Sequence, residues 1–225
     1  MIRVHVICEG QTEEMFIKEV ISDVFCTRSI YLYPLLIGKP GHKGGNISFE
    51  RLFTDVRTLL MEDSAAYCTT FFDFYGLPGV FPGKDQAKSF TGNADKMHCV
   101  TQALTERLKT KLGEEPLRRF IPYVQLYEFE GLLFSEPERL AQGINQPGLA
   151  KKFQAIRNEF KSPEDINDSS VTAPSKRIKS LFPAYDKPVY GSLAAMEIGI
   201  DIIRRECPLF DGWLKRIEML QGCDQ

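Results

Sequence analysis

The stretch that decides the fold is Ile2-Arg3-Val4-His5-Val6-Ile7-Cys8, which is followed directly by Glu9-Gly10-Gln11-Thr12-Glu13. A run of mainly apolar and β-branched residues predicts a strand that is buried on both faces of a parallel sheet. Gly10 interrupts the run. Thr12 and the acidic residues after it favour the start of a helix, with Thr12 as its N-cap.

The same alternation continues along the chain. Further strands are predicted at 30–37, 66–72 and 120–127, and helices at 12–26, 48–61 and 93–112. Alternating strands and helices predict an α/β fold in which helices sandwich a parallel sheet. Pro34 favours an edge position for the second strand. Beyond residue 135 the pattern is helical. We therefore predict an α/β core over 1–134 and a mainly helical extension, packed on that core, over 135–225.

Composition excludes several functional classes. The chain has 225 residues, of which 43% are apolar, and its 28 Lys and Arg against 30 Asp and Glu give a formal charge of −2. A nucleic acid would therefore have to bind to a local basic patch rather than to a globally cationic protein. No apolar run approaches the ~20 residues that a membrane span needs. The first residues do not resemble a secretory signal. We expect a cytoplasmic protein without membrane contact.

Acidic residues follow three of the predicted strands. Glu9 follows the first strand, Asp73 the third, and Glu128 and Glu130 the fourth. The carboxyl ends of parallel strands meet at one edge of a sheet, where ligands bind in open α/β folds. Carboxylates that are brought close together repel one another, and a hard divalent cation is their natural partner. The pattern predicts a metal site that could serve phosphoryl transfer or phosphodiester hydrolysis. Solvated loop acids or helix caps are the competing interpretation.

Several motifs carry a resemblance to known families. They are EGQTEE (9–14), GKPGHKGG (38–45), FFDFYGLPG (71–79), YEFEGLLFS (127–135) and SKRI (175–178). Together they resemble the uncharacterised DUF4276 family, which is considered Toprim-like and is associated with bacterial anti-phage defence. The first motif is also similar to that of Toprim domains, the metal-binding fold of primases, topoisomerases and OLD-type nucleases.

The Toprim resemblance implies a nuclease that depends on Mg²⁺ or Mn²⁺. It implies that Glu9 is the general acid/base or a metal ligand and that Asp73 is a metal ligand. The second aspartate of the family's D-x-D motif is Tyr75 here. One ligand is thereby lost unless Glu13, Glu128 or Glu130 replaces it. An ATPase partner protein is also implied by the resemblance to Toprim defence systems.

Two basic segments are candidates for contacts with DNA or RNA. Lys39, His42 and Lys43 lie on a glycine-rich loop, where backbone N–H groups and cations could contact phosphate. Lys176 and Arg177 lie at a predicted helix start and could follow a nucleic-acid backbone. A solvated loop and a solvated helix face are the respective alternatives. Because the net charge is negative, we expect weak autonomous affinity for nucleic acid and recruitment by a partner.

Two rival functions remain open. Loss of the D-x-D aspartate at Tyr75 favours a catalytically inactive Toprim-like subunit that binds an ATPase complex. Asp73-Phe74-Tyr75-Gly76 faintly resembles the nucleophile motif of haloacid-dehalogenase phosphohydrolases. That family places its nucleophile after the first core strand, whereas Asp73 follows the third, so this rival ranks last. The sequence leaves both a monomer and a homodimer open.

Overall fold

A computed structural model describes residues 1–38, 46–166 and 172–222. Its strands form one parallel sheet in the order β2-β1-β3-β4, with β5 pairing with β3 beyond the end of β4. The strands are β1 (Ile2–Cys8), β2 (Ile30–Leu36), β3 (Tyr67–Asp73), β4 (Phe120–Ile121) and β5 (Val124–Gln125). The predicted parallel α/β sheet between helices is confirmed, and Pro34 does lie on an edge strand.

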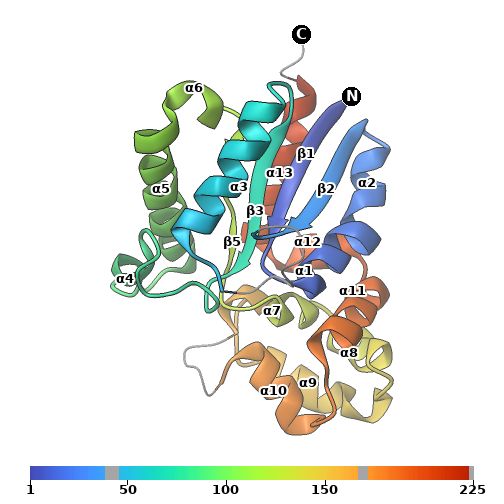
Figure 1. The fold of residues 1–225 in the computed structure, drawn as a ribbon. Coiled ribbons are helices and arrows are strands. Elements are labelled where there is room, and N and C mark those ends of the chain that lie inside the picture. Colours follow the sequence, from blue (N-terminus) through green and yellow to red (C-terminus); the bar gives the residue numbers. More distant parts are fainter. Residues whose placement is uncertain (39–45, 167–171, 223–225) are drawn as a thin grey trace.

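Helices cover both faces of the sheet and one end of it. They are α1 (Gln11–Phe16), α2 (Ser22–Cys26), α3 (Phe49–Glu62), α4 (Lys84–Ala87), α5 (Asn93–Leu112), α6 (Glu114–Leu117), α7 (Glu130–Leu133), α8 (Pro137–Gly143), α9 (Ala150–Arg157), α10 (Pro174–Leu181), α11 (Ser192–Ile198), α12 (Ile200–Glu206) and α13 (Pro208–Glu218). In Figure 1 the strands run downward, and α7 to α10 lie below their carboxyl ends. None of the helices in the described part is both long and apolar enough to cross a bilayer.

Two hydrophobic clusters pack against the sheet, one on each face. On one face, Ile7 of β1 and Phe72 of β3 belong to a cluster with residues of α3 and α5. On the other, Val6 and Phe71 cluster with α1, α7 and α13. Trp213 of α13 stacks on Phe71 with ring centroids 5.3 Å apart and donates a hydrogen bond to Thr69 Oγ1 at 2.9 Å. The late helix α13 therefore forms part of the layer that covers the sheet, because it buries aromatic surface against the central strand.

The predicted strand over 120–127 is divided. Pro122 lies between β4 and β5 and has no N–H to donate to a ladder. The Thr70 hydroxyl replaces the missing backbone pairing, because it donates to Tyr123 O at 2.7 Å and accepts from Tyr123 N at 3.0 Å. The interruption ends the sheet early on this side and lets the chain turn into α7.

The first helix also differs from the prediction. It begins at Gln11 after Gly10, and no side chain caps it, so the N-cap assignment of Thr12 is wrong. Thr12 lies inside α1 and is buried. The predicted helix over 12–26 contains a π-helical segment, Ile17–Ile21, between α1 and α2. With its N-cap at Gly10, α1 carries Glu13 in its first turn, and the Glu13 side chain is buried.

A candidate acidic site at the carboxyl edge of the sheet

Four acidic side chains meet at the carboxyl edge of the central strands. Glu9 follows β1, Asp73 ends β3, Glu13 lies in α1, and Glu130 begins α7. Asp73, Glu13 and Glu130 all form ion pairs with one ammonium group, that of Lys187. The structure thus brings together three acids that the sequence analysis named from three separate segments.

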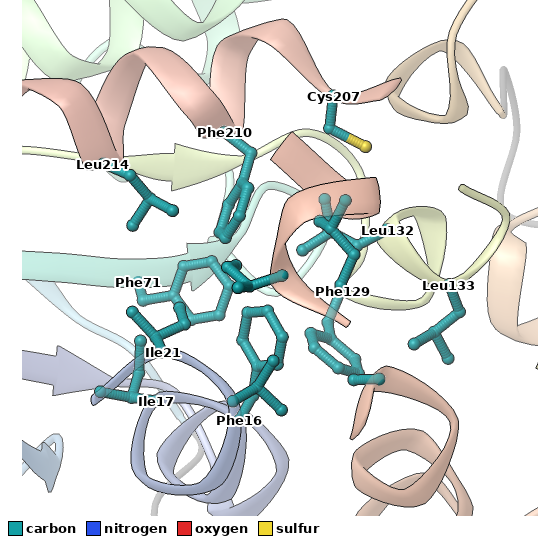
Figure 2. Packing of buried hydrophobic residues seen from close by; sticks show 14 of the residues in the cluster. Phe16, Ile17, Ile21, Phe71, Phe129, Leu132, Leu133, Cys207, Phe210 and Leu214 are labelled. Atoms are coloured by element: carbon teal, nitrogen blue, oxygen red, sulfur yellow. The ribbon is translucent and has the colours of Figure 1, made fainter. Parts of the chain in front are cut away.

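Large apolar neighbours in the sequence hold these acids in place. Phe71 precedes Asp73 by two residues, Phe16 lies one turn after Glu13, and Phe129 directly precedes Glu130. Figure 2 shows Phe16 lying between Phe71 and Phe129 in the hydrophobic cluster. The ring centroids of Phe16 and Phe71 are 5.9 Å apart, and those of Phe16 and Phe129 are 5.1 Å apart. Burial of these rings drives the three segments together, and the acids are brought together as a consequence.

Lys187 provides the cation at the centre of the site. It begins a π-helical segment, η4 (Lys187–Gly191), that precedes α11. Its Nζ lies 2.8 Å from Asp73 Oδ2, 3.1 Å from Glu13 Oε1 and 3.3 Å from Glu130 Oε2. Burial lowers the pKa of Lys187, but the charges of Asp73, Glu130 and Glu13 outweigh it and raise that pKa well above its usual value. Lys187 is therefore a fixed positive charge among the carboxylates.

Hydrogen bonds satisfy the acids unequally. Asp73 Oδ1 accepts from the backbone N–H of Phe129 at 2.7 Å, and Asp73 Oδ2 accepts from Lys187. Both oxygens of Glu130, and Oε1 of Glu13, are buried without a hydrogen-bond partner among the described residues. Burial raises the pKa of Asp73 well above its usual value, although Lys187 opposes this, and burial likewise raises the pKa of Glu130. The site is short of positive charge and of hydrogen-bond donors.

Glu9 lies beside these acids and is more accessible. Its Oε2 accepts from the backbone N–H of Asp73 at 3.1 Å. Burial, together with the charge of Glu13, raises the pKa of Glu9 to about 7. A Cβ at Gly76 would collide with both carboxylate oxygens of Glu9, so this loop position has room only for glycine while Glu9 keeps its place. Glu9 also lines an open hollow of about 330 Å³ together with Gln11, Thr12, Glu13, Lys187 and Pro188.

The fifth predicted acid, Glu128, points elsewhere. Its Oε2 accepts from the backbone N–H of Ser175 at 2.9 Å, at the start of α10. This contact places the predicted basic cluster next to the acidic site. Lys176 is exposed there. Arg177 is held within the fold, because it donates to Thr172 O at 2.9 Å and pairs with Glu159. The other predicted basic residues, Lys39, His42 and Lys43, lie outside the described residues.

Sequence reasoning missed both lysines of the site. Lys187 lies 114 residues from Asp73 in the sequence, and no motif marks it. Lys84, the first residue of α4, is buried and donates to the carbonyl oxygen of Phe74. Burial, with a smaller contribution from the charge of Lys88, lowers the pKa of Lys84 to about 7. Tyr75, at the place of the second D-x-D aspartate, packs against Tyr127 with ring centroids 5.4 Å apart.

The donor chemistry of the site fits a hard divalent cation. Carboxylate oxygens are the ligands that Mg²⁺ and Mn²⁺ prefer, and among the described residues Oε1 of Glu13 and both oxygens of Glu130 are buried without a hydrogen-bond partner. In the part of the chain that the structure describes, no three His, Cys, Asp or Glu side chains are already arranged as a metal site. The point at which the carboxylates meet is held instead by Lys187 Nζ. Asp73, Glu13 and Glu130, with Glu9 beside them, are the residues that would hold a metal.

The fold and the site define a parallel α/β domain with a buried acidic cluster at the carboxyl edge of its sheet. The chain belongs to the DUF4276 family, a domain of unknown function, whose model matches residues 8–218. No curated protein and no solved structure matches the chain.

Proposed function

We propose that this protein is a nuclease of Toprim type that cleaves a nucleic-acid phosphodiester with the help of Mg²⁺ or Mn²⁺. The observation that carries the proposal is the cluster of Glu9, Glu13, Asp73 and Glu130, which holds more buried carboxylates than the fold supplies with hydrogen bonds. Such a cluster is costly for folding and is typical of a functional site. A role in bacterial anti-phage defence follows only from the family resemblance.

Each acid would have a distinct task. Glu9 would accept the proton of the attacking water, because a base with a pKa of about 7 acts efficiently near neutral pH. Asp73, whose Oδ1 is fixed by the Phe129 N–H, would direct Oδ2 into the cluster, with Glu130 and Glu13 beside it. A divalent cation held there supplies Lewis-acid activation of water and neutralises phosphate charge. Glu128 would act indirectly by holding the start of α10.

The surface around the acidic cluster offers few positive charges for binding a nucleic-acid strand. The hollow beside Glu9 opens to solvent, and the exposed Lys176 follows Ser175, whose backbone N–H donates to Glu128. Arg177 is already paired with Glu159, so its charge is partly used. With a formal charge of −2, the chain would bind DNA or RNA weakly by itself. We propose that a partner, an ATPase by the family resemblance, brings the nucleic acid to the site.

Calorimetric titration of Mn²⁺ tests the proposal. We expect saturable binding to the wild type and its loss in Glu9→Ala and Asp73→Asn. The control is Glu159→Gln, an exposed acid paired with Arg177, which should bind Mn²⁺ as the wild type does. Cleavage of single- and double-stranded DNA and RNA is then measured with Mn²⁺. Cleavage that survives Asp73→Asn unchanged would overturn the assignment of this site.

The rival function is a catalytically inactive binding subunit. Two observations favour it: Tyr75 replaces an expected ligand, and Lys187 neutralises part of the acidic cluster. This rival predicts that the wild type binds no Mn²⁺ in the titration. It also predicts that the chain still forms a stable complex with a partner protein, an ATPase by the family resemblance, which a pull-down would detect. If the wild type neither binds Mn²⁺ nor forms a complex, both the nuclease and the binding-subunit proposals are wrong.

A further inference from the structure

Lys187 holds the position at which the acids converge. Its ammonium contacts carboxylates from β3, α1 and α7 at 2.8 to 3.3 Å, so it joins three segments that are far apart in the sequence. A lysine ammonium is a compact point charge at the end of a flexible four-carbon chain. It can fill the place of a small cation, and it can also leave that place without a change in the backbone.

One ammonium does not balance the cluster. Asp73, Glu13 and Glu130 share Lys187, and neither Glu130 oxygen has a hydrogen bond among the described residues. The charge of Lys84 acts on Glu9, but burial lowers the pKa of Lys84 to about 7, so this lysine supplies little positive charge near neutral pH. A divalent cation would bring twice the charge of an ammonium to the same oxygens and could bind them more closely. Mg²⁺ binds carboxylate oxygen at about 2.1 Å, against 2.8 Å or more for the lysine.

The two cations cannot share these oxygens. A metal ion bound to them would lie too close to Nζ for both positive charges to remain. Lys187 has a route out of the cluster, because 30% of its side chain is exposed. The open hollow of about 330 Å³ lies directly beside it, with Pro188 on its border. The side chain could rotate into this hollow while Phe129 and Phe16 keep the acids in place.

We infer that Lys187 and a divalent cation are alternative occupants of this cluster. Lys187 holds Asp73, Glu13 and Glu130 together in the metal-free protein, and metal binding displaces it into the hollow beside Glu9. The inference rests on the proposed function in one respect, since it takes this cluster as the metal site. It adds that the protein carries its own competitor for the metal.

Mn²⁺ calorimetry on the full chain tests the exchange. Lys187→Met removes the competing charge and keeps the length of the side chain, so we expect it to bind Mn²⁺ at least tenfold more tightly than the wild type. Lys187→Arg keeps a cation, with a fork that binds carboxylates at two points, and should bind Mn²⁺ no more tightly than the wild type. The matched control is Lys18→Met, which removes an exposed lysine paired with Glu14 close to α1. It should change the affinity less than twofold.

The outcomes separate the inference from the proposed function. If the wild type binds Mn²⁺ and Lys187→Met binds it equally or more weakly, the exchange is wrong and the metal site stands. If neither protein binds Mn²⁺, both the metal site and the exchange are wrong.

A second measurement covers the case in which Lys187→Met does not fold without metal. Wild-type protein is acetylated with a limiting amine-reactive ester, and each lysine is quantified by mass spectrometry. Mn²⁺ should increase the acetylation of Lys187 severalfold and leave that of Lys18 unchanged. Unchanged labelling of Lys187 at saturating Mn²⁺ would contradict the exchange.

Discussion

Two buried glutamates in this protein have opposite surroundings. Glu164 is 2% exposed, and its two oxygens accept from the backbone N–H groups of Leu209 and Phe210, each at 2.9 Å. Glu130 is 0% exposed and accepts no hydrogen bond among the described residues. Burial raises the pKa of both, that of Glu164 to about 7. Burial and a raised pKa therefore do not distinguish a structural acid from a functional one.

The hydrogen-bond donors make the distinction. Glu164 satisfies N–H groups at the amino-terminal end of α13, where the helix leaves them without partners. The fold thus uses both oxygens of Glu164 as acceptors for two N–H groups. Glu130 faces Lys187, which it shares with two other acids, and its oxygens accept no hydrogen bond from another residue in the described part of the chain. A buried charge that the fold does not use is evidence for a ligand.

The largest difference between the two glutamates should appear in metal affinity. We expect Glu130→Gln to weaken Mn²⁺ binding about 100-fold, which corresponds to roughly 2.7 kcal/mol. Glu164→Gln should leave the affinity within twofold of the wild type. Calorimetry on the two variants measures this difference. Equal losses in both variants would mean that the effect is a general one on folding and would end the comparison.

A smaller loss of affinity should follow from Gly76→Ala. The added methyl group would collide with the carboxylate of Glu9 and displace it, so we expect Mn²⁺ to bind about tenfold more weakly. Gly79→Ala in the same loop is the matched control, because nothing lies within 4 Å of a Cβ there. Calorimetry compares the two variants. Normal binding by Gly76→Ala would show that the position of Glu9 does not matter for the metal.

Glu164→Gln should instead lower the stability, by about 1–2 kcal/mol at pH 5, because its NH2 group cannot accept and would face one of the two N–H donors, whereas both oxygens of a carboxyl group, protonated or ionised, can accept. In the wild type, Glu164 ionises near pH 4.5 when unfolded and near pH 7 when folded. The folded state therefore binds more protons between these values, and its stability falls as the pH rises. The variant lacks this loss. The gap between the free energies of unfolding of the wild type and the variant should therefore narrow toward pH 7.5. Urea unfolding at both pH values measures the gap, and a gap that widens would contradict this account of Glu164.

The smallest effect should be that of Glu130→Gln on stability. Lys187 keeps two of its three carboxylates, and a buried charge without hydrogen bonds is removed. We expect the free energy of unfolding to change by less than about 1 kcal/mol. The same urea unfolding experiment at pH 7.5 checks it. A decrease of about 3 kcal/mol or more in the free energy of unfolding would show that the ion pair of Glu130 with Lys187 is needed for folding.

The sequence predicted the sheet well because its strands are continuous apolar runs. β1 has its predicted bounds, and Pro34 lies on an edge strand as expected. The prediction was wrong at two local features, the continuity of the fourth strand and the start of the first helix. The gap at Pro122 is bridged by the hydroxyl of Thr70, and the start of α1 is set by Gly10 without a cap. The hydrogen bond from the Thr70 hydroxyl leaves no pattern in the sequence, and neither does the absence of a side-chain cap at the start of α1.

The candidate site was predictable in its acids and not in its cations. Glu9, Asp73 and Glu130 were found because each follows a predicted parallel strand and such strands end at one edge, and Glu13 lies close to Glu9 in the sequence. Lys187 is brought to the site by the packing of η4 and α11 against α1 and α8, and nothing near it in the sequence marks it as functional. Glu128 was grouped with the acids by position alone, whereas its contact with Ser175 N turns it toward α10.

The central claim is that the carboxylate cluster at the sheet edge takes a divalent cation. The most direct test is to load the protein with Fe²⁺ in the presence of ascorbate and peroxide, so that hydroxyl radicals cut the backbone next to the bound ion. The account predicts cuts near Glu9–Glu13, Asp73 and Glu130, suppressed by excess Mg²⁺ and weakened in Asp73→Asn. Cuts confined to other segments, or none that Mg²⁺ suppresses, would contradict it.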